Sequence, residues 1–210
     1  MAWSGAGGTG ILISDPVRIF AQTFTSGLSG QLSQIDIPVT QYFQAWYLPV
    51  DTLNVMILGT TPSGVPDFSQ ILSSVSLTPS LVPEKPSVGV DLISLDLTAF
   101  NIPVVSGEVL SIALQTNAPF DMVFGFTSGY EWTMNPGLNP YTGGDMFVSY
   151  DSGANFDFFP LLPIEQGSDL AFRTYVNVSA VPELESYVML IGGLSIFGLM
   201  MRRQRKLAAA

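Results

Sequence analysis

Short runs of alternating apolar and polar residues recur between residues 16 and 180, and clusters of Pro, Gly and Asn separate them. Successive side chains of a β-strand point to opposite faces, so a period of two predicts a strand with one buried face. The positions predicted to face inward are Ile35, Ile37 and Val39; Leu53, Val55 and Ile57; Leu110, Ile112 and Leu114; and Leu170, Phe172, Thr174, Val176 and Val178.

Other segments before Pro182 also favour strands, and none carries the 3.6-residue period of a helix over ten residues. These further strand candidates are Val17–Thr25, Ile71–Thr78, Met122–Phe126 and Met146–Tyr150. Many short strands without helices predict an all-β fold over residues 16–180, an antiparallel two-sheet sandwich that is jelly-roll-like. Arg173, on the last of these strands, is expected to pair with an acidic residue of a neighbouring strand.

The 210-residue chain contains no His and no Cys. The absence of His excludes Ser-His-Asp and Cys-His catalysis. The absence of Cys excludes disulfides, thiol nucleophiles and cysteine-ligated metals. A net charge of −10 disfavours nucleic acid as a partner, because phosphate binding requires clustered Lys and Arg. We therefore predict that the protein is not an enzyme and does not bind nucleic acid.

The C-terminal segment differs from the rest of the chain. The sixteen residues from Ser186 to Met201 carry no charge and would span about 24 Å as a helix. The segment is apolar all round, which favours one short transmembrane helix over an amphipathic helix buried in a soluble domain. Helix positions include Tyr187, Leu190, Leu194, Phe197 and Met201, and the bases Arg202, Arg203, Arg205 and Lys206 follow. Those bases predict a cytoplasmic C-terminus, with the body across the membrane.

Val181, Pro182 and Glu183, followed by this helix and the basic cluster, resemble the PEP-CTERM sorting segment of exported proteins in Gram-negative bacteria that make extracellular polysaccharide. The resemblance covers residues 181–206 and implies recognition by exosortase, a membrane-embedded cysteine transpeptidase-like enzyme that cuts near the Pro-Glu motif. Leu184 stands where the family has a second proline. Two outcomes follow from this departure: the segment is processed, or the protein stays in the membrane as an uncut single-pass anchor.

The body also resembles the sandwich domains of PEP-CTERM and choice-of-anchor proteins. The similar segments are Ala21–Thr25, Gly30–Asp36, Leu95–Leu97, Val104–Glu108 and Asp169–Val176. Some related jelly rolls bind carbohydrate, so the resemblance implies extracellular polysaccharide as a partner.

Residues 1–15 are expected to form an N-terminal extension, and they do not resemble an export signal. No basic residue precedes Arg18, and the apolar run Ile11–Ile13 is too short for a signal peptide. Three explanations are open: a start placed too far downstream, a signal already removed, or a protein that is not exported. We favour the first, because the C-terminal segment is hard to explain without export.

A predicted loop from Ser128 to Asp145 is rich in aromatic and polar residues. Tyr130, Trp132 and Tyr141 would stack on sugar rings, while Glu131, Asn135 and Asn139 would bond to sugar hydroxyls. The preferred alternative is that Tyr130 and Trp132 fill one end of the sandwich, since large aromatic side chains dominate burial.

A second predicted loop holds Asp151, Asn155 and Asp157, whose side-chain oxygens are of the kind that Ca²⁺ prefers. The EF-hand pattern fails, however, because the later Glu is missing. A hydrogen-bonded turn explains the same residues and is the preferred interpretation, so no cofactor is expected.

Charge divides the chain into two unlike parts. Residues 1–181 hold 15 acidic and three basic residues, a net charge of −12, whereas residues 182–210 hold two acidic and four basic residues, a net of +2.

We predict an exported or surface-anchored protein of the cell envelope, a structural component of the cell surface or extracellular polysaccharide matrix. A carbohydrate-binding module around Trp132 is the alternative, and a secreted glycoside-acting enzyme is the weaker one.

Overall fold

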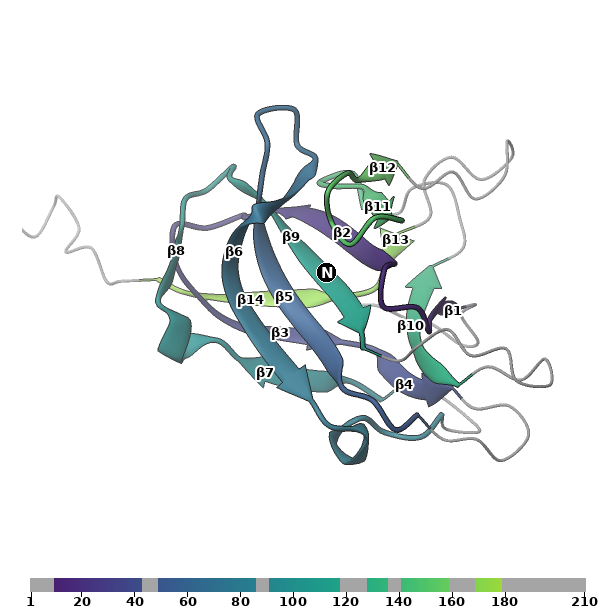
Figure 1. The fold of residues 1–210 in the computed structure, drawn as a ribbon. Coiled ribbons are helices and arrows are strands. Elements are labelled where there is room, and N and C mark those ends of the chain that lie inside the picture. Colours follow the sequence, from purple (N-terminus) through teal and green to yellow (C-terminus); the bar gives the residue numbers. More distant parts are fainter. Residues whose placement is uncertain are drawn as a thin grey trace, which may run out of the picture. The chain divides into compact units, whose positions relative to one another are not determined.

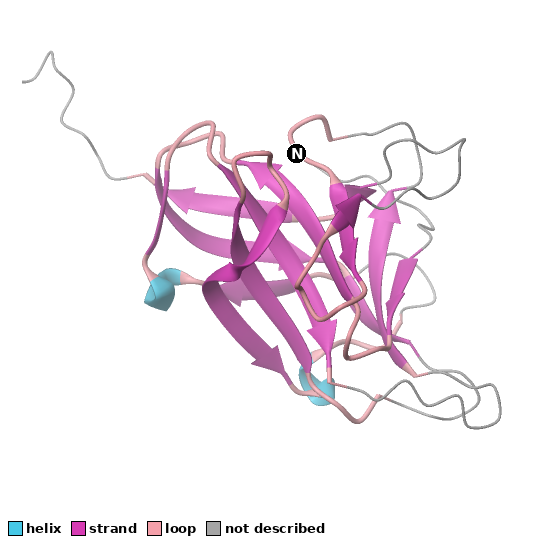
Figure 2. Ribbon diagram, turned by 45° about the horizontal axis from the view of Figure 1, so that its top comes forward, coloured by secondary structure: helices cyan, strands magenta, loops and turns pink. Residues whose placement is uncertain are grey.

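Fourteen β-strands and two single-turn 3₁₀ helices make up the described part of the chain in a computed structural model. The described residues are 10–42, 49–85, 91–117, 128–135, 141–158 and 169–178. The strands are β1 Gly10–Ile13, β2 Ile19–Thr25, β3 Gly30–Ile37, β4 Val39–Tyr42, β5 Leu53–Thr60, β6 Pro66–Leu77, β7 Ile93–Asp96, β8 Ile102–Val104, β9 Val109–Thr116, β10 Gly129–Asn135, β11 Met146–Ser149, β12 Asp157–Phe158, β13 Asp169–Leu170 and β14 Arg173–Asn177, and the 3₁₀ helices are η1 Pro79–Leu81 and η2 Thr98–Phe100. Within these residues there is no α-helix, and the all-β prediction is confirmed (Figure 2).

The strands form three antiparallel sheets, one more than the sequence predicts, in a sandwich-like arrangement (Figure 1). The largest is six-stranded, in the order β12-β11-β2-β9-β5-β6. A four-stranded sheet has the order β14-β3-β7, with β8 also paired to β3, and a second has the order β1-β10-β13, with β4 also paired to β10. All the strand pairs are antiparallel, as the sequence predicts.

Two short breaks carry the chain from one four-stranded sheet to the other. Pro38 separates β3 from β4, and because proline has no N–H to donate it ends the β3 ladder. Its carbonyl oxygen accepts a hydrogen bond from the Thr133 N–H at 3.0 Å, which ties the corner to β10. Ala171 and Phe172 separate β13 from β14 in the same way, and the Ala171 N–H donates to the Thr133 carbonyl at 3.0 Å. The two sheets are therefore joined by covalent corners as well as by packing.

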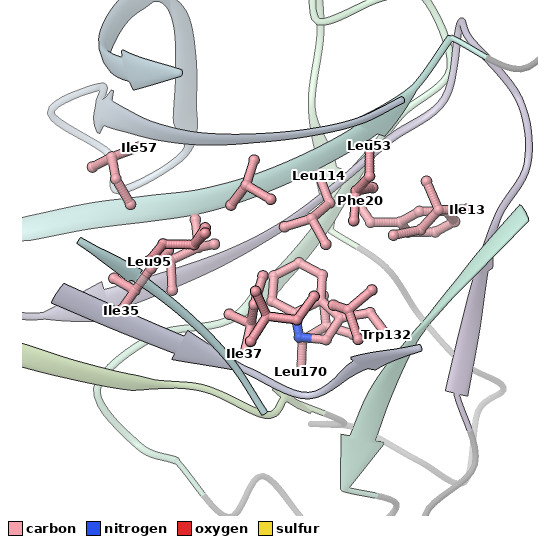
Figure 3. Packing of buried hydrophobic residues seen from close by; sticks show 14 of the residues in the cluster. Ile13, Phe20, Ile35, Ile37, Leu53, Ile57, Leu95, Leu114, Trp132 and Leu170 are labelled. Atoms are coloured by element: carbon pink, nitrogen blue, oxygen red, sulfur yellow. The ribbon is translucent and has the colours of Figure 1, made fainter. Parts of the chain in front are cut away.

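The apolar inner faces of the sheets enclose one large core cluster. Figure 3 shows Ile35, Ile37, Leu95, Trp132 and Leu170 directed into it from different strands. The inward-facing positions predicted for β3 to β4, β5 and β9 are all at most 2% exposed, namely Ile35, Ile37, Val39, Leu53, Val55, Ile57, Leu110, Ile112 and Leu114. Each fully buried aliphatic side chain contributes about 1.5–3 kcal/mol of transfer free energy. In the last predicted run Leu170 is buried, but Phe172, Thr174 and Val176 are half-buried and Val178 is exposed, because β14 lies at the edge of its sheet.

A second, smaller apolar cluster covers the outer face of the six-stranded sheet. Its buried members are Ile19, Ala21, Met56, Leu58, Ala113 and Phe147. Val65, Phe68 and Phe156 pack against them from segments of the same chain. This sheet is thus apolar on both faces over part of its area, and the chain itself covers the outer side.

Two segments differ from the sequence prediction. Residues Gly10–Ile13, assigned to an extension before the domain, form β1, which pairs with β10 and buries Ile11 and Ile13. The predicted loop from Ser128 to Asp145 begins with β10, which pairs with β1, β4 and β13. The strand predicted at Met122–Phe126 lies outside the described residues.

The chain divides between Val178 and Ser179, and every described residue belongs to the N-terminal unit. A search of the described residues finds no helix with the length and apolar character needed to cross a membrane. The predicted helix from Tyr187 to Met201 lies outside those residues.

Gly129, the first residue of β10, provides a test of the β1–β10 pairing. A Cβ added there would clash with the carbonyl oxygen of Ile13, so the backbone of β1 would have to move. We expect Gly129→Ala to lower the free energy of unfolding by about 1–3 kcal/mol in urea denaturation. In the control, Gly27→Ala, no atom lies within 4 Å of the new Cβ, and the change should stay within about 0.5 kcal/mol. Equal losses in the two variants would contradict the close pairing.

Candidate functional site

Trp132 and Tyr130, the predicted sugar-stacking residues, are buried in the core. Both are 0% exposed, because alternate residues of β10 face the inner cluster. The Trp132 indole N–H donates to the carbonyl oxygen of Ala171 at 2.9 Å, and the Tyr130 hydroxyl donates to the carbonyl oxygen of Asp51. Burial, with a smaller contribution from the charge of Asp51, raises the pKa of Tyr130 to about 12. The prediction of a surface platform is wrong for these two residues, and the alternative of internal packing is confirmed.

Glu131 is also occupied, although its side chain points away from the inner cluster. Its carboxylate accepts two hydrogen bonds from the Lys85 ammonium, at 2.8 and 2.7 Å. Glu131 is buried while Lys85 is half-exposed, so this is an ion pair with one end in solvent. The pair holds the segment after η1 against β10 instead of binding a sugar hydroxyl. Asn135 ends β10 opposite Asp169, and Asn139 lies outside the described residues.

Tyr141 is the third predicted stacking residue, and it is half-buried. Its hydroxyl accepts a hydrogen bond from the Thr25 N–H at 3.0 Å and donates to the Thr25 carbonyl at 3.4 Å. The ring meets Phe172 edge-on, with 5.3 Å between the ring centroids. These contacts attach the segment after residue 140 to the end of β2, which is a structural role.

Sequence reasoning missed a polar network inside the fold. Gln22 lies at an inward position between Phe20 and Phe24, and its amide N–H donates to the Asp169 carboxylate at 3.0 Å. The Gln22 amide oxygen accepts from the Leu170 N–H at 2.8 Å, and Asp169 also accepts from the Tyr141 N–H at 3.0 Å. The signal in the sequence that could have revealed this network was Gln22 itself, a polar residue at an inward position of a predicted strand.

Burial raises the pKa of Asp169 above its ordinary value, and the charge of Asp145 adds to this effect. The hydrogen bonds from Tyr141 and Gln22 act in the opposite direction but do not outweigh burial. Asp169 is therefore a carboxyl group whose ionisation opposes folding.

The outer face of the sheet that contains β3, β7 and β14 carries six polar side chains in two rows across the strands. One row is Arg173, Asp36 and Ser94, and the other is Tyr175, Gln34 and Asp96. We call these six residues the polar face. Arg173 lies opposite Asp36 on the neighbouring strand, as predicted.

Asp36 is the centre of the polar face. It accepts hydrogen bonds from the Tyr175 hydroxyl and from the Gln34 amide, each at 2.7 Å. Burial acts to raise the pKa of Asp36, but bonds from Tyr175, Gln34 and Ser94 and the charge of Arg173 together lower it below its ordinary value. The carboxylate is thus held in its charged form by its neighbours.

The loop with the calcium candidates Asp151, Asn155 and Asp157, for which a turn is the preferred interpretation, contains a self-contained hydrogen-bonded turn. Asp151 accepts bonds from the Asn155 side-chain amide at 2.7 Å, the Asn155 N–H at 2.9 Å and the Ser149 hydroxyl at 2.7 Å. These bonds lower the pKa of Asp151, with the Asn155 side chain as the largest cause. Asp157 lies on β12 with an exposed side chain. Across the described ranges, no three His, Cys, Asp or Glu side chains come together as a metal site.

A cleft of about 760 Å³ lies between this turn and the start of β6. Asp67, Phe68, Asn155 and Asp157 are among its lining residues. The Asp67 carboxylate accepts bonds from Ser69 and Gln70 within its own strand, and Phe68 packs on the second apolar cluster. Asp67 and Phe68 thus maintain the local structure.

The predicted sorting residues lie outside the described part of the chain. They are Val181, Pro182 and Glu183, the helix positions Tyr187, Leu190, Leu194, Phe197 and Met201, and the bases Arg202, Arg203, Arg205 and Lys206.

Truncation of Trp132 tests whether it is a core residue. We expect Trp132→Ala to lower the free energy of unfolding by about 3–5 kcal/mol, because it leaves a large cavity and removes the donor to Ala171. Trp132→Phe retains most of the ring and should cost less. Urea denaturation followed by circular dichroism measures both, and a Trp132→Ala variant as stable as wild type would contradict the assignment.

Asp36 and Asp169 predict opposite pH dependences. The lowered pKa of Asp36 adds stability above 3.8, the ordinary value, and that stability is lost as the pH falls through the lowered pKa. The contribution of Asp169 is complete below 3.8 and is lost as the pH rises through its raised pKa. On acidification from neutral pH to about pH 3, the stability advantage of wild type over Asp36→Asn should shrink, and that over Asp169→Asn should grow. Unfolding free energies across this range measure both, and variants that parallel wild type would refute the prediction.

Comparison with protein-family models, with curated proteins and with solved structures finds no match to this chain.

Proposed function

We propose that this chain is an exported or surface-anchored, non-enzymatic protein that is sorted through its C-terminal PEP-CTERM-like segment. Its role is structural, as a component of the cell surface or of the extracellular polysaccharide matrix. The proposal includes a jelly-roll-like, two-layer arrangement of the three sheets described above and one transmembrane helix from Tyr187 to Met201. Exosortase and the membrane are the partners of the segment, and the C-terminus is cytoplasmic before processing.

The observation that carries the proposal is the abrupt change of composition after the last strand. β14 ends at Asn177, and only three residues separate it from Val181, where the sorting motif begins. On one side of this join the chain has a net charge of −12, and on the other it has an uncharged apolar run closed by four bases. An acidic body that resists association with anionic membranes, joined to a short apolar span, suits a protein held outside the membrane by its tail.

The hydrogen bonds of the body support a non-enzymatic role. A glycoside-acting enzyme requires two carboxylates that flank a cleft and reach the substrate. Asp36, Asp151 and Asp169 each accept hydrogen bonds from their own neighbours, and Glu131 is paired with Lys85. These four carboxyl groups are occupied by contacts within the fold, so the enzyme remains the weaker alternative.

Processing of the segment tests the proposal. We expect the full chain, tagged in the exposed turn at residues 62–63, to be shortened and released from the membrane in cells that produce exosortase. In cells without exosortase it should remain full-length in the membrane. Pro182→Ala and Glu183→Gln should each abolish shortening, because they alter the residues that match the sorting motif.

The matched control is Glu84→Gln, which makes the same chemical change at an exposed position of the body and should leave shortening intact. Immunoblots of membrane and medium fractions measure the length and location of the chain. A chain of unchanged length in the membrane of both cell types would overturn the sorting proposal.

A further inference from the structure

The outer faces of the two main sheets differ in chemistry. On the six-stranded sheet, Val65, Phe68 and Phe156 cover a buried apolar cluster, so the chain itself occupies that part of the face. On the sheet that contains β3, β7 and β14, the outward residues are the polar face defined above. The polar face combines one exposed aromatic ring with hydrogen-bond donors and acceptors, which is the combination that recognises sugars.

Tyr175 supplies the ring. It is 42% exposed, although its hydroxyl is held at 2.7 Å by the buried carboxylate of Asp36. The hydrogen bond fixes the orientation of a side chain that would otherwise rotate at the surface, so little conformational entropy is lost when a ligand packs on it. The aromatic plane is therefore prepared for contact with the C–H face of a sugar ring.

Polar groups of both kinds surround the ring. Gln34 lies opposite Tyr175 on β3, and Asp96 lies opposite Gln34 on β7. The Asp96 carboxylate accepts bonds from the Thr98 N–H and hydroxyl, at 2.8 and 2.7 Å, which fixes its position at the surface. Because adjacent strands are about 4.8 Å apart, the row from Tyr175 to Asp96 presents groups at intervals close to the length of one sugar residue.

The charges of the polar face select the type of sugar polymer. Arg173 is its only cation, and it lies opposite Asp36, while Asp96 carries a second negative charge. An anionic polymer would meet at most one basic group, itself beside a carboxylate, in a body of net charge −12. A neutral polymer meets no repulsion and can pair its hydroxyls with both the donors and the acceptors.

We propose that the polar face binds a neutral polysaccharide, with Tyr175 as the stacking residue and Gln34, Asp96 and Arg173 as hydrogen-bonding residues. This inference names the polymer class that the proposed matrix protein contacts, and it rests on that proposed function. It also moves carbohydrate binding from the buried Trp132 to the outer face of the sheet that contains β3, β7 and β14.

Affinity electrophoresis of the full chain in detergent tests the inference, with gels that contain dextran, galactomannan or soluble xylan as neutral probes and alginate as an anionic probe. We expect at least one neutral polymer to retard wild type, while alginate does not. Tyr175→Ala should weaken that binding about tenfold, equivalent to about 1.4 kcal/mol. Tyr175→Phe retains the ring and should bind more tightly than Tyr175→Ala.

Tyr150→Ala is the matched control, because Tyr150 is 56% exposed and lies just after β11 of the other sheet. It should bind as wild type does. The inference would be overturned if no neutral polymer retarded wild type, or if alginate alone did. It would also be overturned if Tyr175→Ala were retarded as much as wild type, or if Tyr150→Ala lost as much binding as Tyr175→Ala. Thermal unfolding of every variant shows that a loss of binding is not a loss of folding.

The two proposals fail separately. Purified protein reports on the polar face without exosortase, so failed binding with intact processing refutes only the polysaccharide site. Intact binding with no processing in either cell type refutes the sorting proposal and leaves the site standing.

Discussion

The burial of alternate side chains between the sheets is the constraint on which the rest of the structure depends. Most strands of the main cluster place their apolar residues at one parity, and a shift of one residue would expose them. In β3 the register shifts by one residue at Ser33, so that both Leu32 and Ile35 face inward. The two corners at Pro38 and at Ala171–Phe172 preserve this parity while the chain passes between sheets. A polar residue among these inward positions, Gln22, is tolerated because Asp169 and Leu170 satisfy its amide on the facing strand.

Sequence alone predicted the all-β class and the inward residues of β3, β5 and β9, because a period of two is a local signal. It failed for β10, where Tyr130, Trp132 and Met134 also alternate, because Gly, Pro and Asn flank a short run and favour a loop. Trp132 is buried because β10 pairs with β1 and β4, which are far away in the sequence. Its neighbours in sequence carry no sign of that double pairing.

The candidate site was beyond sequence reasoning for the same reason. The polar face assembles Arg173 and Tyr175 with Asp36 and Gln34, well over a hundred residues earlier in the chain, and a register between strands aligns them. Only the opposition of Arg173 to an acidic residue was predicted, since a lone base on a strand of an acidic body has few other partners. In the sequence, Tyr175 is indistinguishable from any outward residue of an edge strand. Only the structure shows that its hydroxyl donates a hydrogen bond to Asp36.

The position of β14 has a mechanical consequence. This strand carries two residues of the polar face, pairs with β3 and ends three residues before the proposed sorting motif. If the tail holds the protein while a polymer pulls on the polar face, the load from the tail enters through this five-residue strand, and the load from the polymer is shared among β14, β3 and β7. The force then passes through β14 and its hydrogen bonds to β3, and the main core is spared. Tension would therefore detach the edge strand β14 from β3 before the rest of the body unfolds.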